Sequence, residues 1–221
     1  MRRHVIYIVF LASLLTIGCK DDPSSSYTGK HAQPSEGSRF VYHVETTPPD
    51  GTVKIDTVIY TVNVGSDNVK YVYYGFESAT DRFSTRYEDD DNVTMQMAVS
   101  RTAEHLFFGS LTLPVTGKGG FPDEQIYNSA DFGLQGTARL VSSKAIPVLG
   151  TMHFADEINV TMEARYMDLK FHDIIEPLED RYWWVSKIGG FHRFTKTFLT
   201  VENGALLKTR YDARLIRIEN N

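Results

Sequence analysis

Cysteine is nearly absent from this sequence, since Cys19 is the single one among 221 residues. A disulfide within the chain needs two cysteines and a thiolate metal site needs several, so both are excluded. Stability must therefore come from a hydrophobic core, which a chain of this length can bury within one domain.

An excess of positive charge is also missing, because 23 lysines and arginines face 28 aspartates and glutamates, for a formal net charge of -5. Proteins that bind nucleic acids or anionic membranes through charge carry strongly basic surfaces instead. The composition therefore argues against a nucleic-acid partner.

Long apolar runs are absent apart from residues 5–17, a stretch of 13 residues that follows Arg2 and Arg3. A membrane-spanning helix needs about 20 apolar residues, so this run has the length of the apolar region of a secretory signal. No later run in the sequence is long enough to span, and the rest of the chain is expected to be soluble. Removal of Arg2 and Arg3 with the signal would take the formal net charge from -5 to -7.

The end of that run, Leu15-Thr16-Ile17-Gly18-Cys19, resembles the lipobox of bacterial lipoproteins, where cleavage leaves a lipid-modified cysteine at the new N-terminus. The resemblance implies a signal peptide over residues 1–18, lipidation of Cys19 and a lipid bilayer as partner. Bacterial lipoproteins carry a diacylglyceryl group on this cysteine, and stable anchoring takes two or more acyl chains. The alternatives are an ordinary secretory signal and a short anchor with an incidental cysteine.

The next residues, Lys20-Asp21-Asp22, resemble the export signal of Bacteroidota surface lipoproteins, in which a lysine and two acidic residues follow the lipidated cysteine. The resemblance implies a lipid-anchored protein of the cell outer membrane that is exposed on the surface. The alternatives are an inward-facing location on the same membrane and a generic charged tether.

Residues 19–37 are polar, are broken by Pro23, Pro34 and Gly37, and show almost no apolar periodicity. Such a composition is typical of a flexible linker. We therefore expect a flexible tether over residues 19–37 and a single β domain over residues 38–221.

Helical periodicity is missing as well, since no run of ten or more residues combines a 3.6-residue period with caps. The chain alternates with a period of two instead, which is typical of strands with one buried face. Asn203-Gly204 is the clearest turn, because Asn-Gly favours the tight turns of β-hairpins. Strands are predicted over residues 39–45, 52–64, 69–76, 82–87, 93–99, 105–113, 137–141, 151–154, 159–171, 182–188, 191–201 and 206–218.

Residues 116–136 are rich in glycine, which predicts a long loop or an excursion across the mouth of the sheet, with at most a short helical turn within residues 123–131. Strands in hairpin order make an antiparallel meander, and its edges must close or wrap because open edges invite aggregation. The predicted fold is all-β, a half-barrel or barrel-like curved sheet preceded by a signal helix and a tether.

Two short segments, Tyr182–Phe191 and Gly37–Tyr42, are similar to strand features of bacterial β-proteins and lipoproteins. Together they resemble, over a small part of the chain, the half-barrel of the periplasmic lipoprotein carriers. The resemblance implies a curved sheet of the kind that cradles acyl chains.

Catalytic and metal-binding motifs are missing: the sequence contains no Gly-x-Ser-x-Gly, no phosphate-binding loop, and no His-x-His or His-Glu-x-x-His spacing. The acidic run Glu88–Asn92 carries carboxylates that Ca²⁺ prefers, but it lacks the spacing of a calcium-binding loop and is better interpreted as a solvated turn. The sequence therefore predicts no enzymatic activity, no cofactor and no metal site.

Aromatic side chains are the remaining lead, because tyrosine and tryptophan offer a flat apolar surface with a polar tip. Trp183 and Trp184 are adjacent, so on a strand one must point inward and the other outward. Packing in the core is the alternative role for all of these side chains. The candidate ligand-binding residues are Tyr71, Tyr73, Tyr182, Trp183 and Trp184.

Two functions fit these observations. The first is a binding module for an apolar or glycan ligand, and the second is a structural or assembly partner in a cell-envelope complex. An apolar cavity inside the sheet would favour the first function, whereas a filled interior with an exposed flat patch would favour the second.

Overall fold

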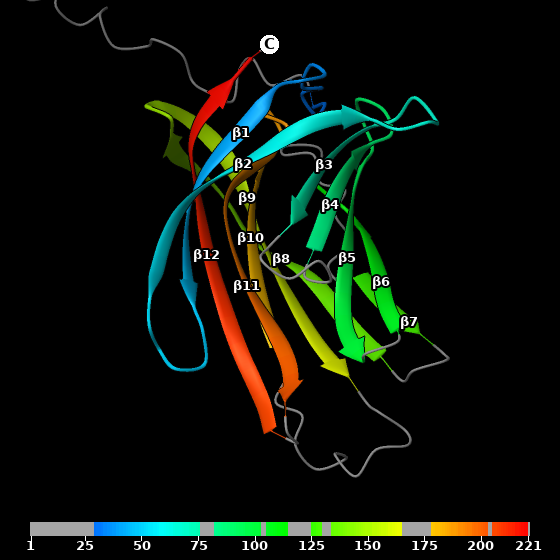
Figure 1. Ribbon diagram of the computed structural model, residues 1–221. Coiled ribbons are helices and arrows are strands. Elements are labelled where there is room, and N and C mark those ends of the chain that lie inside the picture. Colours follow the sequence, from blue (N-terminus) through cyan, green and yellow to red (C-terminus); the bar gives the residue numbers. More distant parts are fainter. Residues whose placement is uncertain are drawn as a thin grey trace, which may run out of the picture.

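The computed structural model describes residues 29–75, 82–102, 105–114, 125–129, 134–164, 178–202 and 205–220. Cys19 and Lys20-Asp21-Asp22 lie outside these residues. All regular secondary structure in the described part is β (Figure 1). The strands are β1 (Arg39–Thr47), β2 (Lys54–Val64), β3 (Lys70–Gly75), β4 (Arg82–Tyr87), β5 (Val93–Thr102), β6 (His105–Thr112), β7 (Gln125–Ser129), β8 (Leu134–Val148), β9 (Thr151–Ala164), β10 (Leu178–Val185), β11 (Gly190–Glu202) and β12 (Ala205–Glu219).

The described strands form one antiparallel sheet in the order β6-β5-β4-β3-β2-β1-β12-β11-β10-β9-β8-β7. Every neighbour in this order is also a neighbour in sequence, except that the first strand pairs with the last. The sheet curves until its two edge strands, β6 and β7, approach each other, which gives a barrel-like shape (Figure 1). The structure thus confirms the predicted all-β antiparallel meander.

Two predictions about the middle of the chain are wrong. The glycine-rich stretch holds β7, because Gln125–Ser129 finds a complete backbone ladder on residues 134–138 of β8. Residues 151–154 and 159–164 belong to one strand, β9, because the intervening residues 155–158 pair with β8, and 156–158 pair with β10 as well. In both places pairing with neighbouring strands overrides the local composition.

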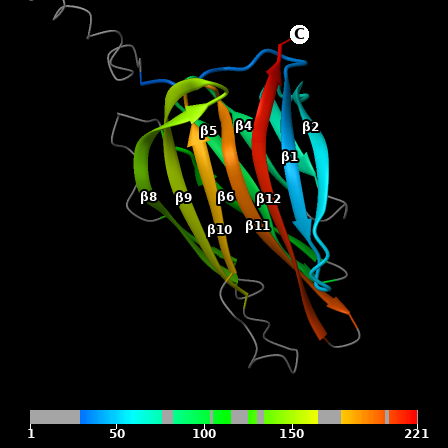
Figure 2. The same ribbon diagram turned by 90° about the vertical axis from the view of Figure 1, so that its left-hand side faces the viewer.

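Residues 29–38, which we call the strap, lie across one end of the barrel (Figure 2). The backbone N–H of His31 donates to Asp90 O at 2.6 Å, that of Ala32 to Ser186 O at 2.7 Å, and that of Gly37 to Val62 O at 2.9 Å. His31 is 3% exposed. Residues 29–37, which the sequence analysis assigns to the tether, are therefore held against the barrel. Backbone hydrogen bonds hold them, and such bonds leave no apolar periodicity in the sequence.

The strap marks one end of the barrel, which we call the strap end. Because neighbouring strands run in opposite directions, every second turn lies at this same end, as does the C-terminus. These turns are β2–β3, β4–β5, β8–β9 and β10–β11. The β1–β2 turn lies at the opposite end (Figures 1 and 2). The described part of the chain therefore begins at the end where these turns lie.

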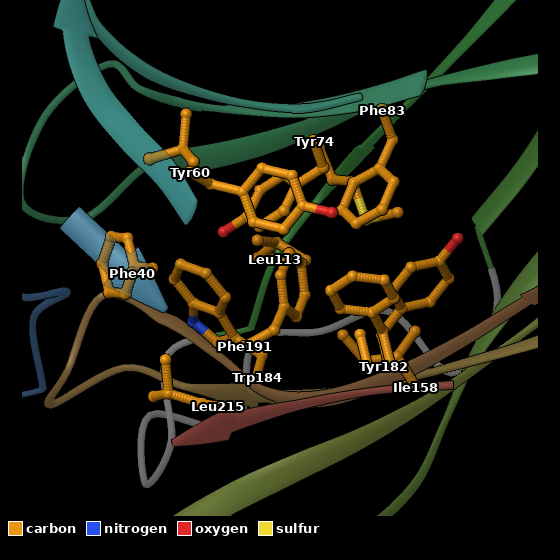
Figure 3. Close-up of a cluster of buried hydrophobic side chains, with 14 of the residues drawn as sticks. Phe40, Tyr60, Tyr74, Phe83, Leu113, Ile158, Tyr182, Trp184, Phe191 and Leu215 are labelled. Carbon is orange, nitrogen blue, oxygen red and sulfur yellow. The ribbon is translucent and has the colours of Figure 1, made fainter. Parts of the chain in front are cut away.

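Aromatic side chains fill the barrel interior near the strap end (Figure 3). The rings of Tyr74 and Phe83 stack at 4.5 Å between centroids, and Phe83 meets Phe194 edge-on at 5.0 Å. Such pairs contribute about 0.5–1.5 kcal/mol each beyond their burial. The fully buried aromatic residues are Phe40, Tyr42, Tyr74, Phe83, Tyr182, Trp184, Phe191 and Phe194. This part of the barrel is a packed core.

The β10–β11 turn is held inside the strap end by two buried tyrosines. The hydroxyl of Tyr42 donates to Phe191 O at 2.6 Å, and that of Tyr87 donates to Gly189 O at 2.6 Å. Gly189 has a φ of 65°, and a Cβ at this position would overlap the carbonyl of Ala32 in the strap. Glycine is therefore required there both by the backbone angle and by the close approach of the strap.

We expect Gly189→Ala to destabilise the domain by more than the strain of a positive φ, which costs about 1–3 kcal/mol, because the new methyl also displaces the strap. Gly51→Ala is the matched control, since Gly51 has a φ of 78° and open space around its Cβ position. Urea unfolding of both variants measures the difference. Equal losses of stability would show that the strap contact contributes nothing.

Candidate binding surface

The five candidate ligand-binding residues occupy three separate places. Tyr182 and Trp184 are fully buried inside the barrel. Tyr71 and Tyr73 point outward from β3, and Trp183 points outward from β10. Four strands lie between β3 and β10 in the sheet. Measured along the sheet, the two strands are therefore roughly 24 Å apart at the usual strand spacing. The structure therefore does not bring the five together into one site.

Trp183 lies on the outer face between Glu157 of β9 and Arg193 of β11, its direct cross-strand neighbours. The guanidinium carbon of Arg193 lies 5.3 Å from the centre of the Trp183 ring, within the range of a cation–π contact. Trp183 is partly exposed. Its ring is thus an accessible aromatic surface fixed by a cation.

Arg193 is itself held by Asp212 of β12. Its Nε donates to Asp212 Oδ1 at 3.0 Å and its Nη2 to Oδ2 at 2.5 Å. These hydrogen bonds raise the pKa of Arg193. A bidentate guanidinium–carboxylate pair fixes geometry as well as charge, so the Trp183–Arg193–Asp212 row is rigid before any ligand arrives.

Glu157 supplies a carboxylate on the other side of Trp183. Ser142 Oγ donates to its Oε2 at 3.0 Å. Lys144 Nζ and Arg181 Nη1 each lie 3.9 Å from its carboxylate oxygens. Its side chain is 13% exposed. The carboxylate is therefore held in position by neighbours that leave part of it accessible.

Arg214 adds a second guanidinium, directly opposite Arg193 in the β11–β12 register. Like charges at directly opposed positions of a sheet repel each other, and Asp212 offsets this repulsion through Arg193. In the described part of the chain, no carboxylate forms an ion pair with Arg214, which is exposed. We define the Trp183 surface as Glu157, Arg181, Trp183, Arg193, Asp212 and Arg214.

The acidic run Glu88–Asn92 forms the β4–β5 turn. The Asp89 carboxylate accepts hydrogen bonds from the backbone N–H groups of Asp91 and Asn92 and from the Asn92 side chain, at 2.7–2.9 Å. The Asn92 side chain contributes most to lowering the pKa of Asp89. These bonds complete the turn. Across the described ranges, no three histidine, cysteine, aspartate or glutamate side chains are placed to hold a metal ion.

A polar depression of about 560 Å³ opens between this turn and the strap. Lys30 of the strap closes one side of it through an ion pair with Asp90 at 3.3 Å, in which both side chains are about half exposed. Its walls are charged and open to solvent, so it suits water and small ions better than an apolar ligand. The lining residues are Lys30, Gln33, Asn68, Lys70, Tyr87, Glu88, Asp89, Asp90 and Asp91.

A buried ion pair inside the barrel was not anticipated from the sequence. Lys196 Nζ of β11 lies 2.9 Å from Asp180 Oδ2 of β10, and the two side chains are 1% and 0% exposed. The other oxygen of Asp180 accepts the backbone N–H of Thr197 at 2.8 Å. The sequence pattern could have indicated that Lys196 is buried, because Phe194, Lys196 and Phe198 occupy every second position of a strand and therefore share its inward face.

Sequence reasoning also missed Glu157, Arg193 and Asp212. They come from three strands other than that of Trp183 and meet it only through strand register. The outward alternation of β10 indicated the tryptophan, but no local pattern indicates which side chains flank it.

No family model and no curated protein matches the chain. Among the described residues, no helix has the length and apolar character needed to cross a membrane.

Three solved structures show some similarity. A Parabacteroides distasonis protein provisionally described as a lipoprotein aligns over 86% of this chain and 99% of its own, with 11% identity and a TM-score of 0.47. An exported protein of Bacteroides fragilis, described as having a YmcC-like fold, gives the same coverage and TM-score with 13% identity. The hypothetical lipoprotein YmcC of Escherichia coli aligns over 90% of this chain and 99% of its own, with 10% identity and a TM-score of 0.33. Similarity at this level defines neither a family nor a ligand.

Proposed function

We propose that this chain is a non-catalytic lipoprotein of the outer membrane, held by lipidated Cys19, whose β domain binds a glycan through the Trp183 surface. The anchor is supported by the lipobox-like residues Leu15–Cys19, and export to the cell surface by Lys20-Asp21-Asp22. The single observation that carries the binding role is the outward-facing Trp183 ring, fixed by Arg193 and flanked by the Glu157 carboxylate.

The filled interior argues against an internal cavity for an apolar ligand, so a binding role has to rest on an outer surface. Near the strap end, the interior is filled by packed aromatic side chains (Figure 3). These rings contact one another and leave no exposed apolar face for a ligand. A sugar ring presents both C–H groups and hydroxyls, so it suits an exposed aromatic ring beside fixed hydrogen-bonding groups. The Trp183 surface supplies both.

The charges of this surface favour an acidic sugar. Arg181, Arg193 and Arg214 lie on neighbouring outward positions of β10, β11 and β12, and Arg193 is largely neutralised by Asp212. Arg214 is the guanidinium best placed to meet a ligand carboxylate, because a guanidinium binds carboxylates in a two-pronged geometry. The preferred class of ligand is therefore an oligosaccharide that contains uronic acid.

We expect Trp183→Ala to abolish most of the binding of uronic-acid oligosaccharides, with an affinity loss of roughly 30-fold or more, as for a central aromatic anchor. Isothermal titration of the protein with uronic-acid and neutral oligosaccharides measures this. Tyr73→Ala is the control, because Tyr73 is an exposed aromatic residue on the distant β3. Unchanged affinity in Trp183→Ala, or no binding by the unmodified protein, would contradict the proposal.

A second candidate function is assembly with an envelope protein, and the edge of β8 favours it. In the described residues, β7 pairs only with residues 134–138, so residues 139–148 of β8, which include a bulge at Val141, have only β9 as a neighbour. An open edge can accept a strand from a partner. A photo-cross-linker at Val141, which is 54% exposed, would link the protein to one defined partner in intact cells if this function holds.

A further inference from the structure

The β8–β9 hairpin ends in an exposed apolar tip. From Ala145 through Ala155 the sequence contains no aspartate, glutamate, lysine or arginine, and burial lowers the pKa of its one histidine, His153, which favours the neutral form. Leu149 is 45% exposed and Met152 is 48% exposed. A segment of this length without charge is unusual for a solvent-facing turn, where polar residues prevail.

The exposed apolar side chains share one face of the hairpin. Pro147 is paired with Met152 next to Leu149 at the tip, and the following pair is the exposed Ala145 with the half-buried Phe154. The opposite face is turned toward the protein, where Val148 is fully buried in the core cluster. The hairpin therefore packs Val148 against the domain and presents exposed apolar side chains on its other face.

Turn chemistry does not explain the leucine at the tip. Leu149 and Gly150 have φ angles of 50° and 81°, as in the tight hairpin turn that Asn-Gly or Asp-Gly ordinarily forms. A leucine in this region is strained, because its side chain crowds the backbone. Leu149 is therefore an apolar residue at a position where the positive φ and the exposure to solvent both favour asparagine.

The tip lies at the strap end, on the side from which the lipid anchor would come. Ala32 of the strap is hydrogen-bonded to the β10–β11 turn, and β10 is the neighbour of β9. Gly29 is ten positions after Cys19, and a fully extended chain of ten steps spans at most about 36 Å. The strap end is thus confined close to any membrane that holds the lipid.

We propose that the β8–β9 tip inserts its apolar face, led by Leu149 and Met152, into the interfacial region of the bilayer that holds Cys19. The inference rests on the proposed lipid anchor. An uncharged apolar tip suits a lipid surface. The chain carries a net negative charge, so apolar contact is a more effective way to bind the bilayer than attraction to anionic lipids. Pro147 lacks a backbone N–H, which makes this part of the edge unsuited to adding a partner strand. The contact orients the barrel with its β1–β2 turn away from the bilayer.

The test uses the mature lipidated protein in vesicles of phosphatidylethanolamine and phosphatidylcholine with brominated acyl chains. Lipidation consumes Cys19, so Met152→Cys introduces a single free thiol for an environment-sensitive fluorophore. We expect its emission to shift to shorter wavelength and to be quenched by bromine. The same label on Asp50→Cys, in the β1–β2 turn, should show neither effect. Protein that fails to float with the vesicles would contradict the anchor and the inference together.

Leu149→Asn separates membrane contact from folding. It creates an Asn-Gly turn, so the melting temperature should stay the same or rise, whereas bromine quenching of the label at residue 152 should fall by most of its amplitude. The inference is overturned if floated protein labelled at residue 152 behaves like protein labelled at residue 50. It is also overturned if an envelope protein shields the label without lipid quenching, which would make the tip a protein-docking surface.

Discussion

Lys196→Met is expected to lower the free energy of unfolding by about 3–5 kcal/mol, because it leaves the carboxylate of Asp180 charged and unpaired inside the barrel. Whole domains of this kind are stable by only about 5–15 kcal/mol, so the variant should be close to unfolding at moderate temperature. Urea unfolding, followed by the fluorescence of the buried Trp184, measures the loss.

The double variant Asp180→Leu, Lys196→Met is the informative control. Replacing both members of a buried ion pair by apolar groups of similar volume is often neutral or stabilising, so the double variant should be more stable than either single one. The hydrogen bond from the Thr197 N–H to Asp180 is lost in the double variant and in Asp180→Leu, but it is kept in Lys196→Met. If the double variant loses the sum of the single losses, the two side chains do not act as a pair.

The ion pair also bears on strand register. Asp180, Tyr182 and Trp184 alternate on the inward face of β10, as do Phe194, Lys196 and Phe198 on β11. A slip by one residue would turn every one of these side chains to the opposite face. Lys196 would then lose Asp180, and Trp184 would leave the core, so charge and aromatic packing specify the same register.

The strand pattern shows what the sequence could predict. In the strand predicted over residues 69–76, a period of two puts Val72 and Tyr74 on one face and Tyr71 and Tyr73 on the other, as the structure has them. Buried side chains recur at every second residue because one face of the sheet is packed. This local regularity sufficed for the fold class and for nearly every strand.

What remained hidden depends on contacts between distant segments. The strap has no apolar period, yet Trp184 Nε1 donates to His31 Nδ1 at 3.1 Å, across 153 positions of sequence. Strand β7 forms because β8 offers a ladder. Trp183 acquires Arg193 and Glu157 only through register. Such contacts are fixed by the curvature of the whole sheet, which a single sequence does not reveal.

Trp184→Ala is expected to destabilise the domain by about 3–5 kcal/mol, the usual cost of removing a large buried aromatic side chain. Trp184 is fully buried, meets Phe191 at 5.0 Å between ring centroids and holds His31 of the strap. Trp184→Phe should recover part of this loss, because it restores one buried aromatic ring; it still lacks the second ring of the indole and the hydrogen bond to His31, the latter worth about 1 kcal/mol.

The adjacent Trp183→Ala should change stability by no more than about 1 kcal/mol, since it removes an exposed cation–π contact. Fluorescence separates the two sites in chains with one tryptophan each. In Trp183→Phe, the remaining Trp184 should emit at short wavelength and resist quenching by acrylamide. In Trp184→Phe, the remaining Trp183 should emit at longer wavelength, be quenched readily and respond to added uronic-acid oligosaccharide. Equal quenching of the two variants would contradict the inward and outward assignment on which both the core and the Trp183 surface depend.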